Sequence, residues 1–276
     1  MRVDWVEPDW PARGGVRALS TLRTGGVSLP PYASLNLGAH VGDIPSAVAE
    51  NRRRLAAEAG LPAEPVWLAQ VHGITVADLD ARASLPAAAP AAAVASGAAR
   101  TAGEASAAGA TSPAVAALTA DAAFTRRPGR VCAILTADCW PVLLAEESGG
   151  VVAAAHAGWR GLADGVIEST VRALRVPPGR LMAWLGPAIG PGHFEVGAEV
   201  REALLREDSG ADGAFSLSAS GRFMADLGML VRRRLAALGV ARIYGGGQCT
   251  HADAERYFSF RRDGVTGRQA TLIWLE

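Results

Sequence analysis

Apolar runs with the character of buried strands fill the middle and the end of the chain. Three of them follow one another at residues 130–139, 141–147 and 151–156, and two more occupy residues 241–246 and 270–276. Short apolar runs bounded by glycine, proline or acidic residues are typical of strands that are covered on both faces. The pattern therefore predicts a sheet-rich core assembled from segments that lie far apart in the sequence.

Helices are expected between these strands. Four segments show the apolar spacing of helices: 46–60, 162–175, 197–206 and 224–238. The first of them runs into Gly60 and Pro62, a common signal for helix termination. Residues 67–80 instead have the pattern of a strand, an interruption and a second strand. Because strands from both ends of the chain are interleaved with helices, we expect one α/β or α+β domain over residues 1–276.

One segment departs from this pattern. Alanine makes up more than half of residues 81–110, and no large apolar residue recurs at helical spacing there. A helix of this composition would have nothing to fasten it to a core. We therefore expect a low-complexity, mobile surface insertion at about residues 84–114.

Residues 141–156 have the pattern of a β-hairpin, with a Glu-Ser-Gly-Gly turn between two apolar runs. If Glu146 pairs with Val151, the side chains of Cys139 and His156 lie diagonally on one face and could share an ion. A register shift of one residue would place them on opposite faces. Pro141 interrupts the ladder near Cys139, which would let that end of the strand curl into a site.

A third residue bears on what Cys139 and His156 could do. His72 ends an apolar run and is followed by glycine, and His156 has glycine two residues after it. A histidine alone is most simply a core imidazole bonded to the backbone, and Cys139 with His156 alone could be a nucleophile and its base. Two histidines and a cysteine together favour a three-ligand Zn²⁺ site, whose fourth position stays open for water.

Composition narrows the classes of protein. The chain has 27 basic and 27 acidic residues, and this zero net charge argues against a nucleic-acid binder. All 27 basic residues are arginine, which excludes a catalytic lysine. The first ten residues are acidic and interrupted by Pro8, unlike a signal peptide, and no apolar run is long enough to span a membrane. The three cysteines are too few for a secreted disulfide framework. We therefore expect a cytoplasmic protein without nucleic-acid or membrane partners.

Motifs along nearly the whole chain resemble those of the bacterial laccase-domain (polyphenol oxidase-like) family. The motifs are RTGGVS (23–28), SLNLGAHVGD (34–43), NR (51–52), QVHG (70–73), ADC-P-VLL (137–144), HAGWRG (156–161), GPAIGP (186–191) and SFRRDGVTGR (259–268). Members of this family are also described as broad-specificity purine nucleoside phosphorylases and as peptidoglycan editing factors. The resemblance implies a cysteine-hydrolase-like fold of mixed sheets flanked by helices in α/β/β/α layers.

The resemblance also implies a cofactor and an activity. The zinc ligands of the family fall on His72, Cys139 and His156. Phosphorolysis of adenosine, inosine, guanosine and methylthioadenosine is implied, together with deamination of adenosine, so that the partners are purine nucleosides and phosphate. Copper could bind, but the five histidines of this chain, without a single His-X-His pair, cannot fill the cluster of a multicopper oxidase.

Other polar residues acquire candidate roles from the resemblance. Asn36 and Arg52 are expected to line the purine and phosphate site as catalytic residues beside Cys139. The alternative for Arg52 is an exposed helical arginine. Asp138 and Arg160 are candidate substrate-binding residues. Asp138 could instead orient a ligand imidazole or cap a buried turn, and Arg160 could bind an anion near a helix start or form a surface salt bridge.

Two positions depart from the family pattern. Trp140 stands where leucine is usual, which indicates a change in packing, and Gly192 with His193 replaces a cysteine pair. The motif residues Glu195, Arg261 and Arg262 have no role assigned by the sequence, and the glycines of GGGQCTH (245–251) are weak evidence for phosphate binding because no lysine follows.

Two alternatives from other functional classes stay open. Cys139 and His156 could form a cysteine hydrolase that acts on amide bonds, including those of faulty peptidoglycan precursors. A zinc-stabilised structural domain is the non-enzymatic alternative, but such sites usually close with a fourth cysteine or histidine, and no fourth family-matched ligand is present. The oligomeric state is not indicated by the sequence.

Overall fold

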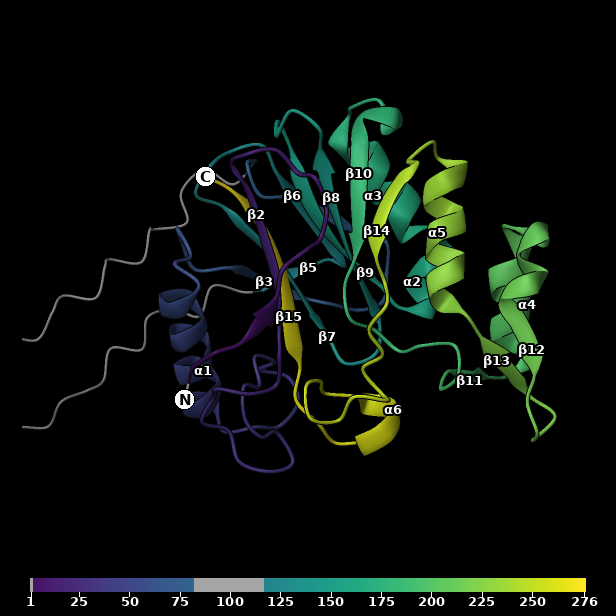
Figure 1. Ribbon diagram of the computed structural model, residues 1–276, viewed down its shortest axis with the longest axis horizontal. Coiled ribbons are helices and arrows are strands. Elements are labelled where there is room, and N and C mark those ends of the chain that lie inside the picture. Colours follow the sequence, from purple (N-terminus) through teal and green to yellow (C-terminus); the bar gives the residue numbers. More distant parts are fainter. Residues whose placement is uncertain (1, 82–116) are drawn as a thin grey trace, which may run out of the picture.

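The computed structural model describes residues 2–81 and 117–276, which form two large β-sheets and one small one (Figure 1). The expected insertion at about residues 84–114 lies outside the described residues. The first sheet has the strand order β1 (Trp5–Val6), β2 (Val16–Thr21), β15 (Gln269–Leu275), β7 (Val131–Thr136), β3 (Val66–Ala69) and β5 (Leu118–Thr119). The second has the order β14 (Arg242–Gly245), β10 (Leu181–Leu185), β8 (Trp140–Glu146), β9 (Val152–Ala157), β6 (Ala122–Thr125) and β4 (Val76–Asp78).

Both large sheets are mixed. In the first, β15 pairs antiparallel with β2 and β7, while β3 pairs parallel with β7 and β5. In the second, β8 pairs antiparallel with β9 and β10, while β14 and β4 join parallel at the two edges. The small sheet, β11 (Glu195–Val196), β13 (Phe223–Ala225) and β12 (Phe215–Leu217), is antiparallel. The expected α/β class with mixed sheets is confirmed.

The two large sheets pack face to face. Alternate residues of a strand point to opposite faces, so Cys132 and Ile134 of β7 meet Leu143 and Ala145 of β8 in one shared core. The opposite face of the first sheet packs against α1 (Pro45–Glu58), where Leu55 belongs to the same core cluster as the remaining β7 residues.

Helices also cover the outer face of the second sheet. They are α2 (Trp159–Asp164), α3 (Val166–Leu174) and α5 (Leu227–Ala237). Leu162, Ile167 and Leu230 of these helices pack on Val142 and Leu144 of β8 in the largest core cluster. A further helix, α4 (Ala198–Arg206), packs on α2 and on β13 of the small sheet. Figure 1 shows α1 on one side of the sheets and α2, α3 and α5 on the other, which is the α/β/β/α layering expected from the resemblance.

Three element boundaries differ from the sequence-based expectation. The segment 162–175 is two helices, because Gly165 adopts a left-handed φ of 98° between α2 and α3. The segment 224–238 begins as the end of β13, and α5 starts only after Asp226, whose carboxylate caps it by accepting from the Met229 amide. The short α6 (Phe260–Asp263) was not expected at all. The strand predictions at β7, β8, β9, β14 and β15 are confirmed.

The register of the central hairpin is the expected one. The Glu146 amide donates to the Val151 carbonyl at 3.0 Å, and Pro141 lies opposite His156. Pro141 does not break the strand as expected but is the second residue of β8, at the start of the ladder, where a missing N–H is tolerated. Cys139 therefore sits immediately before the strand, and its position relative to His156 follows from the pairing.

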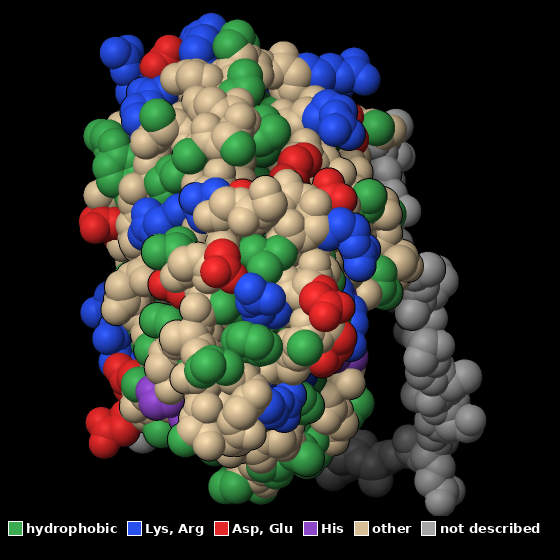
Figure 2. Space-filling model, turned by 90° about the vertical axis from the view of Figure 1, so that its right-hand side faces the viewer, with side chains coloured by type: hydrophobic (Ala, Val, Ile, Leu, Met, Phe, Trp, Pro, Cys, Tyr) green, Lys and Arg blue, Asp and Glu red, His purple; other side chains and the backbone are tan. Residues whose placement is uncertain are grey.

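The surface carries both signs of charge. On the face beside α4 and α5, basic and acidic side chains are interspersed among hydrophobic ones (Figure 2). Within residues 2–81 and 117–276, no helix combines the length and the apolar composition that crossing a bilayer requires.

Trp140, which follows Cys139, fixes how α5 approaches the second sheet. The indole is only 3% exposed. A Cβ placed on Gly228 of α5 would lie 2.6 Å from Cζ2 of the Trp140 ring, closer than real side chains approach. Glycine at position 228 is therefore what allows the large side chain at position 140.

Gly228→Ala tests this packing. It should lower the free energy of unfolding by about 1–3 kcal/mol, the usual cost of overpacking, although alanine favours a helix by about 1 kcal/mol over glycine. Urea unfolding measures the change. The same substitution in a Trp140→Leu background should cost clearly less, whereas equal costs in both backgrounds would show that the ring is not the obstacle.

Candidate metal centre

Three side chains meet where the chain passes between the two large sheets. His72 lies in the loop after β3, Cys139 directly precedes β8, and His156 belongs to β9. Their ligand atoms all lie within 4.8 Å of one another, and Sγ of Cys139 is 3.8 Å from Nε2 of His72. His156 is 3% exposed, while His72 lies open to solvent, so the group has one buried and one accessible side.

Glycine at position 158 lets two of these side chains approach. A Cβ there would lie 2.7 Å from Cδ2 of His72 and 3.1 Å from Sγ of Cys139. One turn later, a Cβ on Gly161 would lie 3.0 Å from the Gly73 carbonyl. The glycines of the HAGWRG motif therefore make room for the His72 loop beside His156.

Asp121, between β5 and β6, organises the histidine ligands. Its side chain is fully buried and accepts hydrogen bonds from the backbone amides of Val71, His72 and Gly73 at 3.2, 2.9 and 2.7 Å. The same carboxylate lies 2.9 Å from Nδ1 of His156. One carboxylate thus holds the His72 backbone, which has a left-handed φ of 61°, and directs Nε2 of His156 toward Cys139.

Asp138 has a different task. Its carboxylate accepts from Oγ1 of Thr250 and from the Arg261 amide, both at 2.7 Å. Asp138 itself has a left-handed φ of 96°, so these bonds hold the turn that aims the next residue, Cys139, into the site. The carboxylate that bonds a candidate ligand imidazole is that of Asp121, not that of Asp138. The Asp138 carboxylate instead stabilises a buried turn, which is the alternative role that the sequence left open.

The sequence analysis did not identify Asp121, because the groups that bond to its carboxylate come from parts of the chain that are distant in sequence. The available signal was one acidic residue inside the otherwise apolar segment 120–124. A charge within a buried run needs several donors, but the sequence does not say which loop supplies them.

The electrostatics favour a thiolate beside a protonated imidazole when no ion is bound. Burial raises the pKa of the Cys139 thiol, but the charge of His156 and hydrogen bonds from both imidazoles outweigh burial and lower it to about 6. Burial lowers the pKa of His156, but the Cys139 thiolate and the bond to Asp121 outweigh that effect and raise it to about 9. A metal ion would take the place of the shared proton.

The residues fit a zinc ion. Two imidazole nitrogens and a thiolate are donors that Zn²⁺ prefers, and the Asp121 bond to His156 is the support that ligand histidines usually have. Among residues 2–81 and 117–276, the group of three or more histidine, cysteine or carboxylate side chains that lie close enough together to hold an ion is His72, Cys139 and His156. The donor set also suits a single copper ion.

Asn36 belongs to the segment 36–38, and Arg52 of α1 contacts the same segment. The fully buried Asn36 accepts from the amides of Gly38 and Arg268 at 2.9 Å and donates to Asp43, so it shapes the segment. Arg52 donates twice to the Leu37 carbonyl, and its guanidinium lies 4.1 Å from the centre of the Trp67 ring.

Neighbouring arginines show that Arg52 is not an ordinary surface residue. Arg53 is 67% exposed and pairs with Glu50, whereas Arg52 is half-buried and has no ion pair among the described residues. Arg160, expected to bind substrate, is exposed and lies 4.3 Å from the Trp159 ring centre. Within residues 2–81 and 117–276, Arg160 has no hydrogen bond to His72, Cys139 or His156. It also lacks, within the same residues, the surface salt bridge that was its alternative role.

The remaining motif residues support the Cys139 turn. Arg261 donates its backbone amide to Asp138 and its side chain to the Glu195 carbonyl. Arg262 donates to the carbonyls of Thr250, His251 and Tyr257. His193, in place of a family cysteine, stacks on His251 with 4.3 Å between ring centres.

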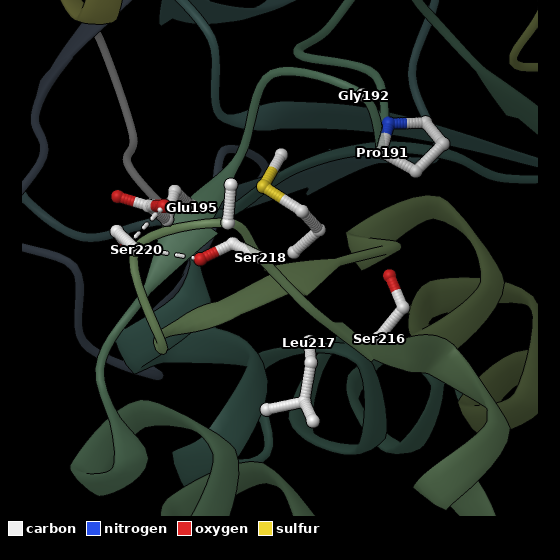
Figure 3. A pocket seen from close by; sticks show the side chains of 9 residues that line it. Pro191, Gly192, Glu195, Ser216, Leu217, Ser218 and Ser220 are labelled. Atoms are coloured by element: carbon white, nitrogen blue, oxygen red, sulfur yellow. Dashed lines mark hydrogen bonds between the residues drawn. The ribbon is translucent and has the colours of Figure 1, made fainter.

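A cavity lies away from the candidate metal centre, beside the β12–β13 hairpin (Figure 3). It is lined by Pro191, Glu195 and the serines of the hairpin, and none of the three candidate ligands borders it. Ser220 donates to Glu195 at 2.8 Å and contacts Ser218 at 3.0 Å, so these polar groups satisfy one another. Among the described residues, the side chains that could hold a metal ion come together at His72, Cys139 and His156.

Known proteins resemble this chain over almost its whole length. Residues 17–276 match the family model described as multi-copper polyphenol oxidoreductase laccase. Purine nucleoside phosphorylase YfiH of Escherichia coli (strain K12) is 48% identical over 270 residues, with 98% of each chain covered. Purine nucleoside phosphorylase PA4543 of Pseudomonas aeruginosa is 49% identical over 273 residues, covering 99% of this chain and 98% of the other.

Solved structures resemble it as well. Neisseria meningitidis protein NMB0706 superposes with a TM-score of 0.84 at 41% identity, covering 99% of both chains. YlmD from Geobacillus stearothermophilus superposes with a TM-score of 0.81 at 30% identity, covering 99% of this chain and 96% of the other. These likenesses confirm the fold expected from the sequence.

Asp121→Asn tests the organising role of the carboxylate. An amide nitrogen cannot accept a hydrogen bond, so the substitution leaves the His72 loop or His156 without its partner. Zinc affinity should fall by about 10–100-fold, the usual effect of losing the partner of a ligand histidine. Competition with a chelating dye measures it.

Asp80→Asn is the matched control. Asp80 also accepts from a hydroxyl and a backbone amide, those of Thr125 and Arg126, but it has no bond to the metal centre. Its substitution should cost stability and leave zinc affinity unchanged. Equal zinc affinities in the two variants would contradict the role assigned to Asp121.

Proposed function

We propose that this chain, which belongs to the multi-copper polyphenol oxidoreductase laccase family, is a zinc-dependent purine nucleoside phosphorylase that also deaminates adenosine. Its substrates would be adenosine, inosine, guanosine and methylthioadenosine, with inorganic phosphate. The similar proteins named purine nucleoside phosphorylase support an enzyme of this kind. The observation that carries the proposal is the convergence of His72, Cys139 and His156 around the Asp121 carboxylate.

A multicopper oxidase does not fit the residues present. Such an enzyme combines one copper site with a further cluster, and the five histidines of the whole sequence cannot supply both. Metal analysis distinguishes zinc from a single copper ion. The proposal expects close to one zinc per chain, with negligible copper unless copper is supplied.

In phosphorolysis, a phosphate oxygen forms a bond to C1′ of the ribose while the bond from C1′ to the purine nitrogen breaks. The purine leaves with the electron pair and gains a proton. When bound, zinc would supply a Lewis acid that stabilises developing negative charge and lowers the pKa of water. In this scheme Asp121 keeps the imidazole of His156 in place, and Arg52 offers positive charge for the phosphate.

Deamination exchanges one bond for another at C6 of adenine. Water adds at this carbon and ammonia leaves, so no phosphate is consumed. The exposed side of the centre beside His72 would admit the purine. Side chains that serve only phosphate should therefore affect phosphorolysis more than deamination.

A second candidate has a specific observation in its favour. Cys139, His156 and Asp121 form a chain of nucleophile, base and orienting carboxylate, with the thiol pKa lowered to about 6. Such a chain could hydrolyse amide bonds, including those of faulty peptidoglycan precursors. That reaction does not require His72, whereas a three-ligand metal centre does.

A purely structural zinc domain is less well supported. Structural zinc sites are usually closed by four protein ligands. Here three candidate ligands converge, and His72 is exposed on one side.

His72→Ala separates the two catalytic proposals. With adenosine, with or without phosphate, the wild-type protein should release adenine and ribose 1-phosphate or inosine. His72→Ala should lose both zinc and turnover, as should Cys139→Ala. Chromatographic separation of the products and zinc analysis provide the measurements. A His72→Ala variant that remains active while Cys139→Ala is inactive would overturn the zinc mechanism in favour of the hydrolase.

Arg52→Gln separates phosphate from metal. Zinc occupancy should remain full, because Arg52 has no bond to the metal centre. Phosphorolysis should fall by at least about tenfold, as expected for the loss of a charge-assisted hydrogen bond, and deamination should fall less. Arg52→Lys should restore little, because a point charge cannot replace the guanidinium fork.

Arg53→Gln is the control on the same helix, since that side chain is exposed and paired with Glu50. It should leave both reactions unchanged. Equal losses of phosphorolysis and deamination in Arg52→Gln would assign Arg52 to the nucleoside instead of phosphate.

A further inference from the structure

A further cavity of about 370 Å³ lies between the first turn of α5 and the glycine-rich loop that follows β14. These two elements meet beyond the carboxyl ends of β10 and β14, which pair in parallel beside α5 (Figure 1). Ligands of α/β proteins commonly bind outside the carboxyl ends of the strands, and small-molecule sites usually measure about 300–1,000 Å³. None of the three candidate metal ligands borders this cavity, so it is separate from the metal centre.

Two side chains of opposite charge line the cavity, and neither is neutralised by the protein. Arg232 of α5 donates to the Gly245 carbonyl, and Asp226 accepts from the Met229 amide. Both side chains are partly buried, and within residues 2–81 and 117–276 neither takes part in an ion pair, whereas the neighbouring Arg233 is paired. Partly buried charges without a counter-ion favour a ligand that supplies one.

The glycines of the loop make room for the guanidinium group. Gly245 and Gly246 have left-handed φ values of 69° and 85°. A Cβ on Gly246 would lie 2.7 Å from Nη2 of Arg232. The glycine run of the GGGQCTH motif therefore lets Arg232 lie along the cavity wall, where a larger residue would displace it.

The wall of the cavity also contains an unpaired hydrogen-bond donor. Nε1 of Trp140 is buried and has no partner among the described residues. In an indole, Cζ2 neighbours the ring carbon bonded to Nε1, and Cζ2 is the Trp140 atom nearest to a Cβ built on Gly228. The N–H edge of the ring thus faces a glycine that itself lines the cavity. Buried donors are nearly always paired, so an acceptor is lacking on this side.

We propose that this cavity binds a free α-amino acid with an apolar side chain. The carboxylate of the ligand would lie beside Arg232 and its ammonium group beside Asp226, so that each unpaired charge gains a partner. Pro191 and Met229 supply apolar surface for the ligand side chain. This binding goes beyond the proposed reaction at the metal centre and does not require it.

The two charges favour a zwitterion over simpler ligands. An inorganic anion beside Arg232 would also meet the Asp226 carboxylate, and a metal ion or an amine beside Asp226 would also meet the guanidinium group. A neutral nucleoside would leave both charges without a counter-ion. A molecule that carries both charges a few bonds apart satisfies both side chains at once.

Thermal unfolding of the purified full-length protein with single amino acids is the first measurement. Alanine, valine, leucine, methionine and phenylalanine are added one at a time at about 10 mM, which detects a Kd of about 1 mM or tighter. At about ten times its Kd, a ligand should raise the melting temperature by about 3 °C. We expect such a rise with at least one of the five.

Calorimetric titration then compares the strongest of these amino acids with its N-acetyl derivative and its amide. Each derivative lacks one of the two charges, so each should bind at least about tenfold more weakly. Inorganic phosphate and inosine are titrated in parallel, and neither should bind in this cavity.

Arg232→Gln and Asp226→Asn assign the two ends of the ligand. Asparagine caps a helix as well as aspartate does, and glutamine keeps an N–H donor for the Gly245 carbonyl, so both variants should fold. Each should weaken binding of the amino acid by at least about tenfold. Arg232→Gln should no longer distinguish the amino acid from its amide, and Asp226→Asn should no longer distinguish it from the N-acetyl derivative.

Arg233→Gln is the control on the same helix, because that side chain is paired with Asp208 and does not line the cavity. It should leave the affinity for the amino acid unchanged. Absence of stabilisation by all five amino acids would overturn the proposal, as would equal affinities for the amino acid and its two derivatives. Binding of phosphate or inosine that is lost in Arg232→Gln would overturn it in favour of an anion site or a nucleoside site. Nucleoside turnover without added amino acid should be the same in wild type and both variants, so the outcome for the proposed function is read separately.

Discussion

A single buried carboxylate, that of Asp121, is the constraint on which the candidate site depends. It has no exposed surface, so its charge must be compensated by donors inside the protein. Three backbone amides of the His72 loop and Nδ1 of His156 supply them. Hydrogen bonds to charged groups contribute about 1.5–3 kcal/mol each. The same bonds that make the burial of Asp121 tolerable therefore position two of the three candidate ligands.

The sheets determine where this carboxylate acts. β7 belongs to the first sheet and β8 to the second, and Cys139 lies in the connection between them. His72 follows a strand of the first sheet, while His156 belongs to the second. An ion held by the three residues would therefore join the two sheets at this crossing. The Asp138 carboxylate fixes the crossing from the other side through Thr250 and Arg261.

Local patterns were sufficient to predict much of this arrangement. The hairpin register followed from its turn residues, and with it the position of Cys139 relative to His156. Helix boundaries were less accessible, because Gly165 divides α2 from α3 through a backbone angle that the apolar spacing does not reveal. The role of Asp121 was beyond the sequence, and the sequence left that of Asp138 open between alternatives, since both depend on donors contributed by distant parts of the chain. Arg268 belonged to a motif, but its place beside Leu37 results from tertiary packing.

X-ray absorption at the zinc K-edge of the purified protein tests the central claim most directly. The account predicts about one zinc per chain, coordinated by two nitrogens at about 2.0–2.1 Å and one sulfur at about 2.3 Å, with the sulfur signal absent from Cys139→Ser. A sulfur-free coordination shell would contradict it. So would nucleoside turnover by protein that contains neither zinc nor another metal.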